Sequence, residues 1–172
     1  MRITLEFFVG LFLKLFMRWS YWISKEKRVL VESGPNLEFE DIHKYAITLS
    51  KKWSYISDPL FGVYNTIASP EIVWRSLEGD CDDFASHLIQ LSRNYKPILL
   101  TYFTWNEKDA HTVVLIWNQN DYYTFNWGQL NQSSNFETCI EQLERYAGSK
   151  IISYHTAKYD YIKRRFVPSR VN

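Results

Sequence analysis

A turn that opens into a helix, at residues 79–88, is the stretch that most constrains how this chain folds. It reads Gly-Asp-Cys-Asp-Asp-Phe-Ala-Ser-His-Leu. From Phe84 to Leu91, apolar residues recur at spacings of four and three, which indicates a helix that packs one face into a core. Asp80 is a good N-cap residue, so the helix is predicted to begin at or next to Cys81.

A thiol at the start of a helix lies near backbone N–H donors and the positive end of the helix dipole. Both favour the thiolate, and this predicts a reactive Cys81 with a lowered pKa. Asp82 and Asp83 act in the opposite direction, because neighbouring negative charges raise a thiol pKa. The competing interpretation is that Cys81 is a small buried residue with no chemical role.

The rest of the pattern predicts an α+β fold. β-Branched and aromatic runs predict strands over residues 98–105, 111–117 and 122–127, and a further strand over residues 151–155. Residues 118–121 read as a hairpin turn between two of these strands. Helices are predicted from about residue 38, at the Ser-Pro step of residues 69–70, and over residues 137–147. The Cys81 helix is expected to pack against the antiparallel sheet.

Two polar residues fall at matching ends of the predicted hairpin. His111 begins its first strand and Asn126 ends its second, so antiparallel pairing brings them to the same end of the sheet. A thiol, an imidazole that takes its proton and an amide that holds the imidazole form a cysteine acyl-transfer site. The alternative is that His111 and Asn126 are simply polar strand ends.

The segment from Trp74 to Leu91 resembles the cysteine segment of the transglutaminase-like, papain-fold cysteine peptidase superfamily, especially its bacterial and phage members. The resemblance covers about residues 53–128 and extends to Tyr55-Ile56-Ser57-Asp58 and Pro70-Glu71. It implies a papain-like transglutaminase fold and a catalytic triad of Cys81, His111 and Asn126. The third position is more often Asp in that family, and Asn126 departs from this, since a neutral amide stabilises an imidazolium less than a carboxylate does.

The expected activity is cysteine-dependent acyl transfer on amide bonds, through a thioester at Cys81. The enzyme would be a peptidase, a deamidase or a transglutaminase with a protein or peptide substrate, and it would need no metal or organic cofactor. The backbone N–H of Cys81 is one candidate oxyanion donor, and Trp74 and Asn65 are candidates for a second.

Residues 1–28 form a predicted unit of their own, ahead of a domain over residues 29–172. Residues 1–24 are apolar and aromatic, with one narrow polar stripe, which predicts a helix buried on most sides. It would be a core helix or would dock on a partner protein; a membrane surface is the weaker alternative. The apolar run is short for a membrane span and lacks a signal-peptide cleavage site, which favours the cytoplasm, or the virion or host cytoplasm for a phage protein.

Two other kinds of function remain open. The fold could be a structural or docking module with an idle cysteine, which the 17% aromatic content favours. Nucleic-acid binding through the basic C-terminal residues from Lys158 onward is a weaker alternative, because the formal charge is only +1 and a short basic run is usually a solvated surface. The two cysteines, Cys81 and Cys139, lack the spacing of a zinc site or a disulfide framework.

Overall fold

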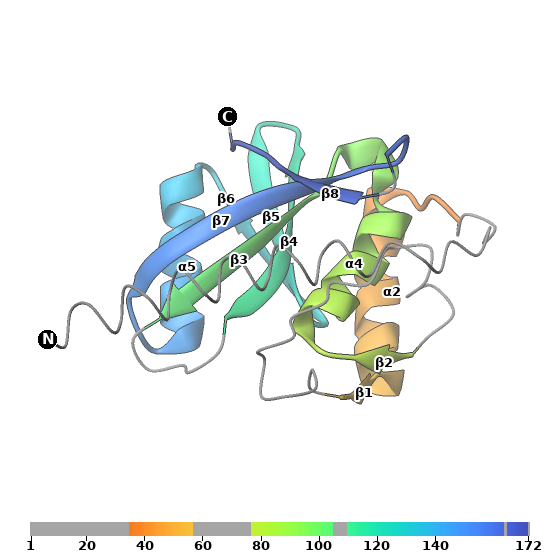
Figure 1. Ribbon diagram of the computed structural model, residues 1–172, viewed down its shortest axis with the longest axis horizontal. Helices are drawn as coiled ribbons and strands as arrows, with labels where there is room; N and C mark the ends of the chain where they lie inside the picture. Colours follow the sequence, from red (N-terminus) through yellow and green to blue (C-terminus); the bar gives the residue numbers. More distant parts are fainter. Residues whose placement is uncertain (1–34, 57–76, 105–109, 164, 172) are drawn as a thin grey trace, which may run out of the picture.

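A six-stranded antiparallel sheet, in the order β6-β5-β4-β3-β7-β8, forms the centre of the computed structural model (Figure 1). The structure describes residues 35–56, 77–104, 110–163 and 165–171. Its strands are β3 (Ile98–Thr104), β4 (His111–Asn118), β5 (Asp121–Asn126), β6 (Gln129–Ser133), β7 (Ile151–Asp160) and β8 (Arg165–Pro168). A separate parallel pair joins β1 (Ser54–Tyr55) to β2 (Glu78–Gly79). The predicted segment over residues 1–28 and the helix predicted at residues 69–70 lie outside the described residues.

Helices cover both faces of this sheet. α2 (Phe39–Lys52) and α4 (Cys81–Leu91) lie on one face, and α5 (Phe136–Ala147) lies on the other (Figure 1). A short 3₁₀ turn, η2 (Arg93–Tyr95), leads from α4 into β3. The predicted combination of helices with an antiparallel sheet is confirmed, and so is the packing of the Cys81 helix against it. None of the helices in the described part of the chain is long and apolar enough to cross a membrane.

The core on the α4 face explains why this helix is held so firmly. Nine of the eleven α4 residues are buried, from Asp82 through Leu91 with the exception of Asp83. Phe84, Leu88 and Leu91 are buried with strand residues such as Val114, and apolar burial of this kind is the main force that docks an amphipathic helix. The start of α4 is therefore fixed relative to β4.

The β4–β5 hairpin forms where the sequence predicts it. Asn118 pairs with Asp121, and the two residues between them, Gln119 and Asn120, have the positive φ angles of a two-residue hairpin turn. His111 is the first residue of β4 and Asn126 is the last of β5, as predicted. The hairpin therefore carries both polar residues at its open end.

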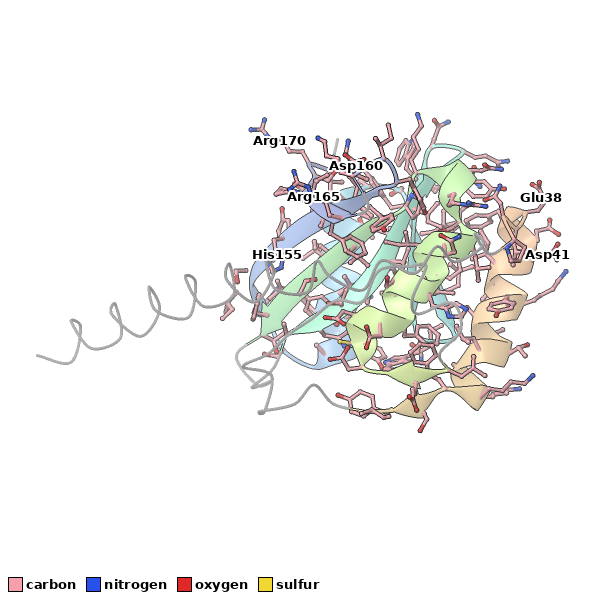
Figure 2. The ribbon with its side chains drawn as sticks, turned by 45° about the vertical axis from the view of Figure 1, so that its right-hand side comes forward. Glu38, Asp41, His155, Asp160, Arg165 and Arg170 are labelled. Carbon is pink, nitrogen blue, oxygen red and sulfur yellow. The ribbon has the colours of Figure 1, made fainter. Side chains whose placement is uncertain are left out.

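The C-terminal third differs from the prediction. The strand that begins at residue 151 continues to Asp160, and β8 pairs with its second half. Asp160 pairs with Arg165, the basic residue of β8 (Figure 2), and the backbone N–H of Lys163 donates to the Asp160 carboxylate. Sheet pairing converts the expected basic tail into a hairpin of mixed charge. Asp160 thus interrupts the continuous positively charged surface that nucleic-acid binding would use.

Candidate active site

A tight turn delivers the chain to α4. Gly79 has φ of +142°, and a Cβ atom at this position would overlap the Asp83 carboxylate, so glycine is required here. The Trp53 indole N–H donates to the Gly79 carbonyl at 2.9 Å, and the Ile56 N–H donates to the same oxygen at 3.1 Å. Trp53 and Ile56, the residues on either side of β1, thereby hold the turn in place.

Cys81 is the first residue of α4, as predicted. Asp80 is the N-cap, and its side chain accepts a hydrogen bond from the Asp82 N–H at 3.1 Å. This bond satisfies one of the N–H groups that the first helical turn leaves unpaired. The cap fixes the direction in which the Cys81 side chain leaves the helix.

The Cys81 thiol lies against the backbone on both sides of His111. Its Sγ is 3.9 Å from the Ala110 carbonyl oxygen, to which the thiol donates a hydrogen bond, and the Thr112 N–H points toward the same sulfur. Helix α4 and strand β4 therefore bring the thiol and the His111 backbone to one end of the sheet.

His111 and Asn126 form a hydrogen bond across the open end of the hairpin. The distance from His111 Nε2 to Asn126 Oδ1 is 2.9 Å, and Asn126 is buried. An amide oxygen accepts hydrogen bonds, so this contact requires the proton on Nε2 and leaves Nδ1 with its lone pair. Neutral His111 thus has its lone pair on Nδ1, but among the described residues no hydrogen bond joins the His111 ring to the Cys81 sulfur.

The expectation of a lowered Cys81 pKa is wrong for this structure. Burial raises the pKa of the Cys81 thiol to about 12, and the nearby carboxylates of Asp80 and Asp82 raise it further against the Thr112 hydrogen bond. Desolvation therefore outweighs the position at the helix start. At neutral pH the resting side chain is a thiol, and a partner has to remove its proton during any reaction.

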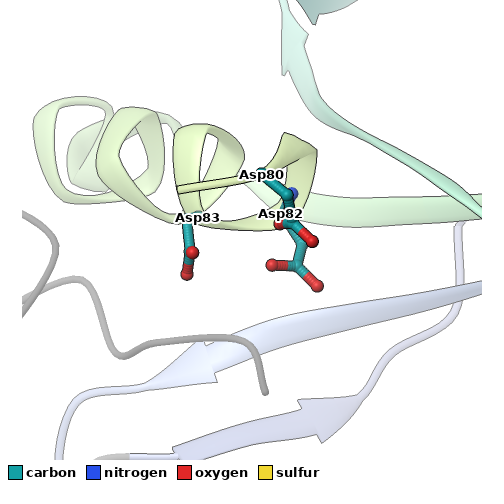
Figure 3. Close-up of side chains that lie close together, drawn as sticks. All are labelled: Asp80, Asp82 and Asp83. Atoms are coloured by element: carbon teal, nitrogen blue, oxygen red, sulfur yellow. Dashed lines mark hydrogen bonds between the residues drawn. The ribbon is translucent and has the colours of Figure 1, made fainter. Parts of the chain in front are cut away.

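Three carboxylates surround the start of α4. Oxygen atoms of Asp80, Asp82 and Asp83 all lie within 4.8 Å of one another, and Asp82 is buried (Figure 3). Carboxylate oxygens are ligands for hard cations, so in the described part of the chain these residues are the candidates for holding one. Two of them, Asp80 and Asp82, also add to the effect of burial in raising the pKa of Cys81.

We expect the alkylation rate of Cys81 by iodoacetamide to rise about tenfold for each pH unit from pH 7 to 10, because only the thiolate reacts. Cys139 is the internal control. Burial also raises its pKa to about 12, but it is completely buried whereas Cys81 is partly exposed, so Cys139 should react more slowly throughout. Mass spectrometry of the two tryptic peptides measures both rates. A plateau for Cys81 near pH 7 would contradict the neutral resting thiol.

Other predicted site elements cannot be placed. The oxyanion candidates Trp74 and Asn65 lie outside the described residues, as do Ser57-Asp58 and Pro70-Glu71.

The structure adds aromatic neighbours of His111 that the sequence did not reveal. The ring centroids of His111 and Tyr146 are 6.4 Å apart with nearly parallel planes, and those of His111 and Tyr102 are 5.5 Å apart in an edge-on contact. The pairing of Tyr102 with His111 depends on strand register, and Tyr146 lies on a different element, so neither contact has a local sequence signal.

No protein-family model and no curated protein sequence matches the chain. Among solved structures, it is similar to LapG of Legionella pneumophila in its calcium-bound form, with 13% identity and a TM-score of 0.49 over 74% of this chain and 68% of that one. A second LapG structure gives 12% identity and a TM-score of 0.47 over the same shares. An EGTA-treated form gives 13% and 0.47 over 78% of this chain and 74% of LapG. This distant likeness concerns overall shape, and no residue role is taken from it.

Proposed function

We propose that the protein is a cysteine-dependent acyl-transfer enzyme of the papain-like transglutaminase type, in which Cys81 attacks an amide carbonyl. The observation that carries the proposal is the hydrogen bond between His111 and Asn126 at the end of the hairpin, with the Cys81 sulfur against the backbone on either side of His111. Nucleophile, base and orienting amide are the three parts that such chemistry requires.

The proposed reaction starts from the protonated Cys81 thiol and the lone pair on His111 Nδ1. Cys81 Sγ bonds to the carbonyl carbon of the substrate while His111 Nδ1 takes the thiol proton, so general-base catalysis replaces a preformed thiolate. The C–N bond then breaks, and the imidazolium returns the proton to the leaving amine. A thioester remains on Cys81. Water or a second amine attacks it, and the thiol is regenerated with its proton.

The nature of the second step decides the type of enzyme. Attack by water on a peptide thioester makes a peptidase, attack by water on a glutaminyl thioester makes a deamidase, and attack by an amine makes a transglutaminase. The proposed substrate is a protein or peptide in each case, and the residues assigned here use neither a metal nor an organic cofactor. A cytoplasmic or virion location, a bacterial or phage origin and a docking role for residues 1–28 remain proposals from the sequence.

Substitutions of Asn126 test the proposed role of its amide. Asn126→Ala should lower the single-turnover acylation rate by about tenfold or more, because the imidazole loses its tautomer and orientation. Asn126→Asp should keep or raise the rate, since a carboxylate oxygen can accept the same Nε2–H bond and stabilises the imidazolium. The Asn126 Nδ2 has no hydrogen-bond partner in the described structure, so the Asp variant sacrifices no such bond.

The readout is release of p-nitrophenol from an activated ester, with circular dichroism to confirm that both Asn126 variants are folded. If Asn126→Ala acylates at the wild-type rate, Asn126 does not orient His111. The assignment of the third residue would then be wrong.

A docking module with an idle cysteine is the second candidate function. The raised pKa of Cys81 favours it, because an idle buried cysteine has the same property. So does the half-exposed side chain of Trp117, near the end of β4 away from His111, since aromatic residues are enriched in interfaces. A wild-type protein that never acylates would favour this module over the enzyme.

A further inference from the structure

Tyr146 is half-exposed, yet its ring is engaged with the proposed base. It is the penultimate residue of α5, on the opposite face of the sheet from α4, and its side chain is 50% exposed. Its ring lies 6.4 Å from the His111 ring with an interplanar angle of only 21°, which is an offset stack. A half-exposed tyrosine can turn its ring into solvent, so the parallel stack of Tyr146 on the His111 ring needs an explanation.

The imidazole is bounded on three sides by different elements. Tyr146 of α5 stacks on its face, Tyr102 of β3 meets it at 76° with ring centroids 5.5 Å apart, and Asn126 of β5 accepts from its Nε2. Tyr102 is completely buried and therefore rigid, whereas Tyr146 is the contact on the solvent side. Without Tyr146, one face of the imidazole would meet water.

We propose that Tyr146 is a positioning residue for His111: its ring holds the imidazole against Tyr102 and shields the hydrogen bond to Asn126 from water. This inference rests on the proposed function of His111 as the base. A hydrogen bond excluded from water is electrostatically stronger, and a stacked ring restricts rotation of the imidazole about its side-chain bonds. Both effects fix the direction in which His111 Nδ1 points. The phenolic hydroxyl has no part in this role, since the stack uses the ring alone.

Nuclear magnetic resonance of the free protein tests the inference without any substrate. In the wild type, the carbon-bound ring protons of His111 should be shifted upfield by the ring current of Tyr146, and the Nε2–H should be visible because its exchange with water is slow. In Tyr146→Ala, both the upfield shift of the ring protons and the visible Nε2–H signal should be lost. Tyr146→Phe keeps the ring and should retain both.

Trp117→Ala is the matched control. Trp117 is 51% exposed, close to the value for Tyr146, but it lies near the end of β4 away from His111, where its ring contacts Tyr122. Its removal should leave the His111 signals unchanged. Circular dichroism and thermal unfolding of all three variants separate a local change at His111 from a loss of fold.

Acylation by an activated ester provides the second readout. Tyr146→Ala should lower the single-turnover rate constant by roughly ten- to a hundredfold with little change in substrate affinity, because misplacing a catalytic group costs rate and not binding. Tyr146→Phe and Trp117→Ala should match the wild type. Unchanged His111 signals in Tyr146→Ala, or a Tyr146→Phe variant as impaired as Tyr146→Ala, would overturn the inference.

The two proposals fail in different ways. A wild-type protein that does not acylate refutes the proposed function, and the nuclear magnetic resonance signals still decide whether Tyr146 holds the imidazole. A wild-type protein that acylates while Tyr146→Ala acylates equally well keeps the proposed function and removes the role of Tyr146.

Discussion

Replacing His111 with alanine is expected to slow acylation of Cys81 by about a hundred- to ten-thousandfold, the range that a general base contributes. The expected loss of rate is large because the pKa of the Cys81 thiol is raised. With a pKa of about 12, very little thiolate exists at neutral pH, so the reaction depends on a base that removes the proton during attack. Stopped-flow measurement of p-nitrophenol release at pH 7 gives the rate constants of both proteins.

The pH profile separates loss of the base from a general disturbance of the site. The His111→Ala rate should rise with pH in parallel with the alkylation rate of Cys81, because hydroxide in bulk water becomes the only route to the thiolate. His43→Ala is a suitable control, since His43 lies on α2 and contacts Phe125 and not the site. If His111→Ala acylates as fast as this control variant, His111 is not the base.

Phe84→Ala is expected to lower the free energy of unfolding by about 3–5 kcal/mol, the usual cost of removing a buried phenylalanine ring. Phe84 is only 2% exposed, and its ring lies 5.2 Å from that of Trp53 and 4.7 Å from that of Trp127. It joins the start of α4 to α2 and to the residue after Asn126. The cavity would loosen the packing of the start of α4 against Trp53 and Trp127.

Phe103→Ala is the matched control for this loss. Phe103 is 37% exposed, so its removal should cost about 1 kcal/mol or less. Urea unfolding followed by tryptophan fluorescence gives both free energies. Equal losses for the two variants would show that the Phe84 cluster is not a main anchor of the fold.

The sequence predicted those parts of the structure that depend on local signals. Asp80 caps α4, and Gly148, in the left-handed conformation, closes α5. Both are signals carried by single residues at helix ends. The β-branched and aromatic runs of residues 111–117 and 122–127, with the turn residues between them, identified the hairpin, and the hairpin placed His111 beside Asn126.

Features that depend on long-range packing were missed. Strand β6 pairs with β5 at one edge of the sheet, and β8 pairs with β7 at the other. The sequence of β6 is mostly polar and β8 has only four residues, so neither stands out as a strand. The sequence also could not reveal that desolvation would dominate the Cys81 pKa. That depends on how closely α4 docks against β4, which no local pattern reports.

The contact between Tyr146 and His111 is another long-range feature. It joins the end of a helix on one face of the sheet to the first residue of a strand. Tyr146, which we propose as a positioning residue for the base, therefore comes from a part of the chain that the resemblance to a known family does not cover.

The most direct test of the account is the intact mass of the wild-type protein after brief exposure to an activated ester at neutral pH. The account predicts one added acyl group, mapped by peptide sequencing to Cys81 and not to Cys139, released by hydroxylamine as a thioester is, and absent from His111→Ala over the same time. No adduct on the folded wild-type protein, or an adduct on Cys81 that forms equally fast in His111→Ala, would contradict it.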